Sequence, residues 1–102
     1  MALILVYVTH ASKEDAKKLA SHLLEKRLIA CANLFPINSI YRWKGKVEDA
    51  EEFVSLLKAR PENWEALKKE ILSVHPYETP CIIKLDAEAN HGFDGWANAE
   101  SG

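Results

Sequence analysis

The stretch from residue 29 to residue 60 constrains the fold of this chain more than any other. Two runs typical of β-strands flank Lys44 and Gly45, and glycine accepts the positive φ that a two-residue hairpin turn needs. A strand over residues 30–43 would span roughly 45 Å at about 3.3 Å per residue, whereas typical strands have about five or six residues. The sequence therefore predicts an unusually long β-hairpin.

The far end of this hairpin is predicted to need a partner. Its large apolar side chains are Ile40, Tyr41, Trp43, Val47 and Phe53. A chain of 102 residues can build one modest core, and it cannot also cover so long a hairpin. Because natural proteins avoid open apolar strand edges, we infer that the hairpin packs on other copies of the same protein.

Composition and charge exclude several classes of partner. The net charge of −2 gives no general attraction to nucleic acid or to an anionic membrane. The apolar run over residues 2–8 has no basic segment before it and is too short for a signal peptide or a membrane span. Cys31 and Cys81 form no CxxC pair and suit a reducing compartment. We expect one domain over residues 1–102, located in the cytoplasm.

The N-terminal part of the chain predicts a strand followed by a helix. The continuous apolar run over residues 3–8 indicates a buried, central strand. Ser12 is the expected N-cap of the helix, with Asp15 three residues later, and the helix should end near Arg27. The apolar stripe of this helix consists of Ala16, Leu19, Ala20, Leu23 and Leu24.

Three prolines mark the next boundaries. Pro36 predicts a bulge or an edge position in the first arm of the hairpin, because proline cannot donate to a β-ladder. Pro61 suits the first turn of a second helix. Pro76 disfavours helical geometry in the residue before it, so this helix should stop at Ser73 or Val74.

A short strand over residues 81–85 and a weak helix over residues 93–99 complete the chain. The resulting order, β-α-β-β-α-β with a short C-terminal helix, is the α+β ferredoxin-like arrangement, in which two helices cover one face of an antiparallel sheet. Its usual strand order, 4-1-3-2, makes the first strand central. It also places Cys31 and Cys81 on opposite edges, so no disulfide is expected within one subunit.

Three motifs resemble the successive signatures of the CutA family, the divalent-ion tolerance proteins. They are residues 27–33 (Arg-Leu-Ile-Ala-Cys-Ala-Asn), 39–46 (Ser-Ile-Tyr-Arg-Trp-Lys-Gly-Lys) and 75–80 (His-Pro-Tyr-Glu-Thr-Pro). The resemblance covers nearly the whole chain. It implies a ferredoxin-like fold with PII-like trimer architecture, a homotrimer held by the long hairpins, a cytoplasmic location, and an association with copper and other divalent cations. It assigns no reaction.

The resemblance also bears on a metal site. Some family members offer a cysteine and a second histidine at positions that correspond to Val8 and Val74 here, which leaves His75 as the best candidate ligand. Glu78 could add an oxygen ligand, and Cys31 is soft enough for copper(I). The alternatives are that His75 caps a helix C-terminus, Glu78 is a solvated residue, and Cys31 is a small buried apolar side chain. Any bound copper or other divalent cation is not expected to be required for folding.

Other residues have a structural and a functional interpretation. Glu48, Asp49, Glu51 and Glu52 form an acidic run that could hold hard cations weakly, or that keeps a solvated strand end from stray pairing. Tyr41 and Trp43 could stack on a ligand, or fill an interface between subunits. His10, His22 and His91 are placed at surface or loop positions.

Four functions compete. The leading one is a non-enzymatic homotrimer that binds metal ions or a small ligand in clefts between subunits. An RNA-binding domain shares the order of elements, but the acidic residues 47–53 would repel phosphate. An enzyme would need a nucleophile, a base and an orienting group, and no such set is visible. A PII-like sensor or scaffold that regulates a partner protein could use Arg42, Lys44 and Lys46, by fold analogy.

Overall fold

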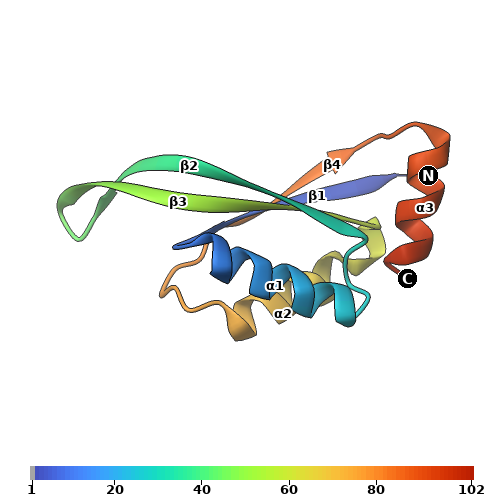
Figure 1. Ribbon diagram of the computed structural model, residues 1–102, viewed down its shortest axis with the longest axis horizontal. Coiled ribbons are helices and arrows are strands. Elements are labelled where there is room, and N and C mark those ends of the chain that lie inside the picture. The colour runs from blue at the N-terminus through green and yellow to red at the C-terminus, as the bar shows by residue number, and fades with distance from the viewer. Residues whose placement is uncertain (1) are drawn as a thin grey trace.

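The computed structural model describes residues 2–102. The strands are β1 (Leu3–His10), β2 (Cys31–Trp43), β3 (Lys46–Ala59) and β4 (Ile82–Ala87). The helices are α1 (Lys13–Glu25), α2 (Trp64–Val74) and α3 (His91–Glu100), and a short 3-10 helix, η1 (Pro61–Asn63), leads into α2. The antiparallel sheet has the order β2-β3-β1-β4, with α1 and α2 on one face (Figure 1). This confirms the predicted order of elements and the predicted strand order.

The alternation of side chains along β1 separates the two faces of the sheet. Ile4, Val6 and Val8 are buried beneath the helices, whereas Leu5 and Tyr7 point to the opposite face and are only half-buried. The core on the helical side consists of Ile4, Val6, Val8, Leu19, Leu23, Ile29, Leu57, Ala59, Leu67 and Ile71. The central position predicted for this strand is therefore confirmed, and its burial is complete on the helical face alone.

Helix α1 begins as predicted. The backbone N–H of Asp15 donates to the Ser12 hydroxyl oxygen at 3.1 Å, which satisfies one of the free N–H groups of the first turn. After the last turn Arg27 takes a positive φ of 56°, and the N–H of Leu28 bonds back to the carbonyl of Leu23 at 3.0 Å. Leu24, assigned by its spacing to the apolar stripe, is 44% exposed at the margin of that stripe.

The hairpin has the predicted turn and length. Lys44 and Gly45 have φ angles of 49° and 82°, the left-handed values of the tight turn that matches the twist of paired strands. The β2–β3 register runs without interruption from Cys31 opposite Lys58 to Trp43 opposite Lys46. Because β2 is an edge strand, Pro36 fits there without a bulge, which decides between the two predicted alternatives.

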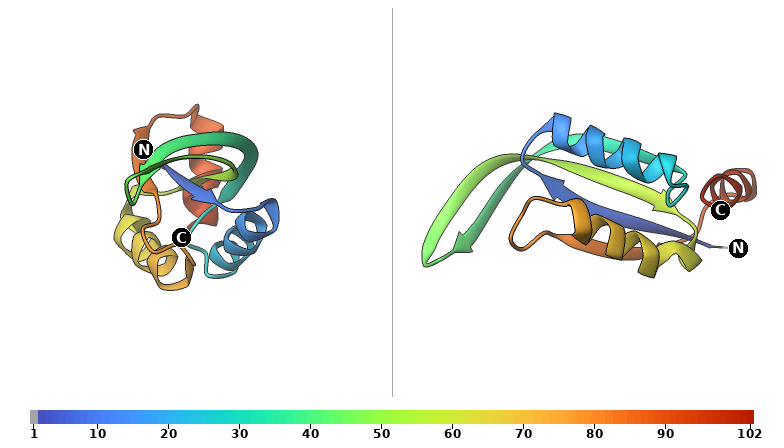
Figure 2. Two further views of the ribbon diagram at one scale, coloured as in Figure 1. Left: turned by 90° about the vertical axis from the view of Figure 1, so that its left-hand side faces the viewer. Right: turned by 90° about the horizontal axis from the view of Figure 1, so that it is seen from below.

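The distal half of the hairpin extends beyond the two helices (Figure 2). The molecule is 45 Å long, while α1, with 13 residues, covers only roughly 20 Å at 1.5 Å per residue. Ile40 and Val47 near the turn are 72% and 65% exposed. Phe53, expected with them, instead lies at the base of the hairpin opposite His10 and is half-buried.

The C-terminal elements differ from prediction only at their ends. Helix α3 begins two residues before the predicted start at Phe93, and β4 runs from Ile82 to Ala87. Helix α3 lies at the end of the molecule opposite the hairpin turn (Figure 1), where Ala97 joins Leu3 and Ala30 in a small second cluster. The Lys58 ammonium group lies 5.3 Å from the centre of the Phe93 ring on α3.

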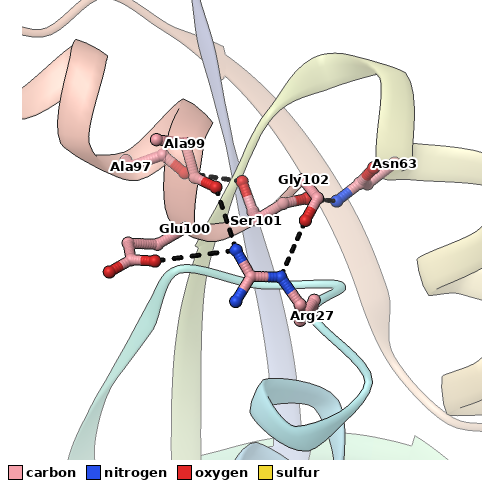
Figure 3. Close-up of polar contacts among 7 residues, drawn as sticks. All are labelled: Arg27, Asn63, Ala97, Ala99, Glu100, Ser101 and Gly102. Atoms are coloured by element: carbon pink, nitrogen blue, oxygen red, sulfur yellow. Dashed lines mark hydrogen bonds and ion pairs between the residues drawn. The ribbon is translucent and has the colours of Figure 1, made fainter.

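Arg27 holds the end of α3 against the α1–β2 connection (Figure 3). Its Nε donates to the carbonyl of Gly102 at 2.8 Å, and its Nη2 donates to the carbonyl of Ala99 at 3.2 Å. The same Nη2 lies 3.7 Å from the Glu100 carboxylate. A cation at this position compensates the carbonyl groups that the last turn of a helix leaves unpaired.

Asn63 completes this junction. Its Nδ2 donates to the carbonyl of Leu28 at 3.1 Å and to the carbonyl of Ser101. Ser101 is fully buried; its hydroxyl donates to the carbonyl of Ala97 at 2.6 Å and accepts the N–H of Arg60 at 3.1 Å. One amide side chain thus joins the end of α3 to the α1–β2 connection and to η1.

Replacing Asn63 by Ala should destabilise the protein by about 1–3 kcal/mol, because two partly buried carbonyls lose their donor. Urea unfolding at one protein concentration measures this, and hydrogen exchange should show α3 opening first. The neighbouring Glu62→Ala is the control, since Glu62 is exposed. Equal free energies of unfolding for the two variants would show that the hydrogen bonds of Asn63 do not stabilise the protein.

Candidate ligand-binding cleft

A cleft of about 580 Å³ lies where the hairpin leaves the body of the protein, a volume that suits a small organic molecule. It is formed by the end of β1, the distal part of β2, one residue of β3 and the segment between α2 and β4. The lining residues are Tyr7, Thr9, Ser39, Ile40, Tyr41, Trp43, Glu52, Tyr77, Glu78, Thr79 and Cys81. By strand alternation Tyr7 and Thr9 face away from the helical core, so the cleft opens on the other face of the sheet.

A hydrogen bond between Tyr77 and Glu52 closes one side of the cleft. The Tyr77 hydroxyl donates to Oε2 of Glu52 at 2.5 Å, and Glu52 is only 8% exposed. Burial, together with this bond and the charge of Glu52, raises the pKa of Tyr77 well above its usual range. Tyr77 therefore remains a protonated donor, and it joins the α2–β4 segment to β3.

Two stacked histidines lie behind this bond. The rings of His10 and His75 are 5.3 Å apart at 25°, and the Tyr77 ring meets His75 edge-on at 4.7 Å. His10 is buried, and its Nε2 lies 2.7 Å from the hydroxyl of Ser55. Burial, and next the neighbouring His75, lower the pKa of His10 to about 4. His10 is therefore neutral at physiological pH.

The bonds of His75 define its tautomer. Nε2 lies 2.9 Å from the carbonyl oxygen of Thr9, which can only accept, so Nε2 carries the proton. Nδ1 accepts the backbone N–H of Tyr77 at 3.2 Å. The backbone N–H of His75 also bonds to the carbonyl of Ile71 at the end of α2. Both ring nitrogens are thus engaged in positioning the α2–β4 segment.

The three predicted metal ligands lie in different places. Glu78 lines the cleft, and His75 lies behind Tyr77. Cys31 pairs with Lys58, five residues along β3 from the level of His10, which is roughly 16 Å away. Among residues 2–102, no group of three or more His, Cys, Asp or Glu side chains could hold a metal ion. Within one chain Cys31 does not join the other two, and the role of all three as ligands stays a prediction.

The other cysteine lies beside the cleft. Cys81 immediately precedes β4 at one edge of the sheet, while Cys31 begins β2 at the other, and both thiols are free. The predicted placement on opposite edges is confirmed. Burial, followed by the charge of Glu52, raises the pKa of Cys81, which leaves its thiol a weak nucleophile and a weak metal ligand.

Two residues in or beside the cleft, Glu52 and His10, do not have the environment predicted for them. Glu52 was assigned with its acidic neighbours to a solvated or cation-holding run, and it is buried by Tyr77. His10 was placed at a surface or loop position and is 2% exposed. The alternation of Ile4, Val6 and Val8 continues to His10 on the helical face, and this signal could have identified its burial.

The other two histidines remain accessible. His22 is partly exposed, and its Nε2 lies 2.6 Å from the Glu70 carboxylate, a bond that contributes most to lowering the pKa of Glu70. His91 begins α3 and is exposed, as expected for a loop or surface position. Neither residue lines the cleft.

The hairpin turn bridges to the loop on the far side of the cleft. The Lys44 ammonium group lies 3.8 Å from the Glu78 carboxylate, and both side chains are 72% exposed, so this ion pair contributes little stability. The same ammonium group lies 5.7 Å from the centre of the Trp43 ring. The Lys44 ammonium group therefore lies near both the Glu78 carboxylate and the Trp43 ring at the rim of the cleft.

Comparison with known proteins shows one consistent relationship. Residues 4–100 match the family model described as CutA1 divalent ion tolerance protein. A divalent-cation tolerance protein CutA from Pyrococcus horikoshii is 41% identical over 100 residues, which is 97% of this chain and 98% of that protein. A protein of the same name from Archaeoglobus fulgidus is 43% identical over 83 residues, 81% of each chain.

Solved structures agree over almost the full length. A structure from Archaeoglobus fulgidus, described as a periplasmic divalent cation tolerance protein CutA, has a TM-score of 0.93 at 38% identity and covers 98% of this chain and 99% of that one. CutA1 from Oryza sativa has a TM-score of 0.93 at 33% identity and covers 98% of this chain and 94% of that one.

Each helix described between residues 2 and 102 falls short of the length and apolar character that crossing a bilayer requires.

The neutral state of His10 should make stability depend on pH. In the unfolded chain His10 is protonated as the pH falls below 6.5, whereas in the folded protein it is protonated only near pH 4. The stability linked to His10 is therefore complete above pH 6.5 and is lost as the pH falls toward about 4. Urea unfolding between these limits should show a steeper loss in the wild type than in His10→Gln, whose amide can still bond to Ser55.

His91→Gln is the matched control, because His91 is exposed. That variant should keep the wild-type pH dependence. The same pH dependence in wild type and His10→Gln would show that His10 titrates normally in the folded protein.

Proposed function

Because this chain belongs to the CutA1 divalent ion tolerance protein family, we propose that it is a non-enzymatic homotrimer whose clefts between subunits bind divalent cations, copper among them, or a small ligand. One observation carries the proposal: the hairpin extends beyond the helices (Figure 2), and within residues 2–102 its distal apolar side chains Ile40 and Val47 are 72% and 65% exposed. The proposed location is the cytoplasm, which cell fractionation can test against the periplasmic description of the Archaeoglobus fulgidus relative.

Exposure of two apolar surfaces supports assembly. Near the hairpin turn Ile40 is 72% and Tyr41 44% exposed, and Trp43 is 37% exposed at the cleft. On the sheet face opposite the helices, Ile83 and Leu85 of β4 are 49% and 50% exposed. Closed symmetry would cover both surfaces in every copy equally. Exposure indicates more than one copy, and the resemblance to CutA proteins implies three.

The proposed cation site rests on residue chemistry and on the family description. His75 supplies imidazole and Glu78 supplies carboxylate, both common ligands of divalent metals. Metal binding through Nδ1 of His75 would have to displace the N–H of Tyr77. Cys31 could join His75 and Glu78 as a metal ligand only from a neighbouring copy. Within one chain it pairs with Lys58, five residues along β3 from the residue that pairs with His10. The proposed cation is not a requirement for folding, a role consistent with the absence of His75, Glu78 and Cys31 from the main core cluster beneath the helices.

A PII-like sensor or scaffold that regulates a partner protein is the second candidate. The cleft has the volume of an organic-ligand site, and the described residues offer no set of three metal ligands around it. Arg42, Lys44 and Lys46 surround the hairpin turn and could contact a partner. Lys44 is already paired with Glu78, so ligand entry could alter the rim that a partner would meet.

Trp43→Glu should weaken the assembly by about 2 kcal/mol or more, because it places a charge among the apolar side chains proposed to form the interface. Sedimentation equilibrium of wild type and variant measures this. Unfolding should occur with dissociation if the subunit has no stable monomeric form.

Two controls accompany this experiment. Lys17→Glu changes the charge of an exposed residue on α1 and should leave assembly unchanged, and Trp43→Phe should preserve it. A folded wild-type monomer at micromolar concentration would contradict the proposed trimer. An intact trimer in Trp43→Glu would place the interface elsewhere.

His75→Ala should weaken copper(II) binding at least about tenfold, or about 1.4 kcal/mol, if His75 is a ligand. Affinity should also fall at acidic pH, because imidazole binds metal only when neutral. Titration calorimetry measures both, with the exposed His91→Ala as the control. Unchanged affinity in His75→Ala would restrict His75 to its role in positioning the α2–β4 segment.

A further inference from the structure

A second cleft, of about 400 Å³, lies on the face of the sheet that carries α1 and α2 (Figure 1). It is formed by α1, the end of β1 and the segment that follows α2. The proposed assembly covers the hairpin and the opposite face of the sheet, and neither of these surfaces includes this helical-face cleft. Its lining residues are His10, Asp15, Lys18, Leu19, His22, Val74, His75 and Pro76.

His10 lies at the floor of the helical-face cleft, and its hydrogen bond to Ser55 fixes the position of its ring proton. The side chain is 2% exposed, and its Nε2 lies 2.7 Å from the Ser55 hydroxyl oxygen. Ser55 is fully buried, and within residues 2–102 its hydroxyl has no other partner, so Nε2 is the only acceptor for the hydroxyl proton. Because a buried donor without an acceptor is costly, the hydroxyl donates to Nε2. The proton of the ring is therefore on Nδ1.

Nδ1 of His10 is a donor that the chain leaves without an acceptor. No oxygen atom of residues 2–102 accepts its proton. No fully buried side-chain nitrogen of these residues lacks a partner, so Nδ1 must reach the surface of the cleft. The neighbouring His75 supplies only a wall, because both of its ring nitrogens are engaged elsewhere. The floor of the cleft thus offers an N–H group to an oxygen atom of a ligand.

Two opposite charges of α1 line the same cleft. Asp15 is half-buried and Lys18 is exposed, and within residues 2–102 neither forms an ion pair. Residues three positions apart lie on the same side of a helix, so both charges face the cleft. His22, one turn further along, is already bonded to Glu70, which lies outside the lining. The carboxylate and the ammonium group are therefore the two charges open to a ligand, and their sum is zero.

We propose that the helical-face cleft binds an apolar α-amino acid in its zwitterionic form. The carboxylate of the ligand accepts the Nδ1 proton of His10 and pairs with Lys18, while its ammonium group pairs with Asp15. Its side chain contacts an apolar wall. This wall consists of Leu19, Val74 and Pro76.

The volume of about 400 Å³ suits so small a molecule, because ligand pockets begin near roughly 300 Å³. One chain supplies every group of this site, so the site goes beyond the proposed function and its clefts between subunits.

Titration calorimetry of the full chain with L-leucine and two analogues tests the ligand class. L-Leucinamide lacks the carboxylate, and 4-methylpentanoate lacks the ammonium group. Leucine should bind saturably and at least about tenfold more tightly than either analogue. Lys18→Gln should lower the affinity for leucine at least about tenfold and change that for leucinamide little. Asp15→Asn should likewise weaken leucine and change 4-methylpentanoate little.

Lys17→Gln is the matched control, because Lys17 is an exposed residue of α1 that does not line the cleft. This variant should keep the wild-type affinity for leucine. The NMR resonance of the His10 Nδ1 proton gives a second readout, and it should shift on addition of leucine but not of leucinamide. No saturable binding of leucine, or equal binding by wild type and Lys18→Gln, would overturn the inference. An unshifted His10 resonance in the leucine-bound protein would also contradict it.

Sedimentation of the same samples measures assembly separately. A trimer that does not bind leucine would contradict the amino-acid site and leave the proposed assembly standing.

Discussion

The uninterrupted pairing of β2 with β3 is the interaction on which the rest of this structure depends. At its base the ladder is part of the core, where Leu57 and Ala59 of β3 lie beneath the helices. The same ladder then continues past the helices to the turn at Lys44 and Gly45. Its backbone hydrogen bonds hold the distal strands together beyond the core, and the apolar side chains of Ile40 and Val47 are exposed there.

A polar junction marks the point where the hairpin leaves the core. Tyr77 bonds to Glu52 on β3, and His75 bonds to the end of β1 through the carbonyl of Thr9. These bonds draw the α2–β4 segment across the end of the sheet, and this segment forms one wall of the cleft. Because buried polar groups are costly without partners, the junction should hold a single geometry. The stability of the hairpin base and the shape of the cleft thus depend on the same side chains.

A second polar junction stabilises the opposite end of the molecule. Arg27 and Asn63 bind the carbonyl groups at the end of α3, and Ser101 is buried between them and β3. Helix α3 has few apolar contacts beyond the small cluster of Leu3 and Ala30, so these polar bonds compensate for limited burial. The two junctions lie at opposite ends of the sheet, and the cleft lies beside the junction at the hairpin end.

Local patterns in the sequence determined the elements and their order. Short-range physical signals predicted the Ser12 cap, the turn at Lys44 and Gly45 and the end of α2 before Pro76, and the structure contains all three. For Pro36 the sequence predicted a bulge or an edge position, and the structure has the edge position. The strand order followed from that element order. The motifs, with their resemblance to CutA proteins, indicated the family. They also singled out Glu78, Tyr41 and Trp43, which line the cleft.

Only the tertiary structure decided which distant side chains meet. Glu52 and Tyr77 are 25 positions apart, His10 and Ser55 are 45 apart, and Thr9 and His75 are 66 apart. Each contact depends on strand register and on where the α2–β4 segment crosses the sheet, and neither leaves a periodic mark in the sequence. For this reason Glu52 resembled a solvated acid, and although the alternation along β1 extends to His10, the sequence did not indicate its partner Ser55. Burial by residues far along the chain, rather than residue type, gives both side chains their chemistry.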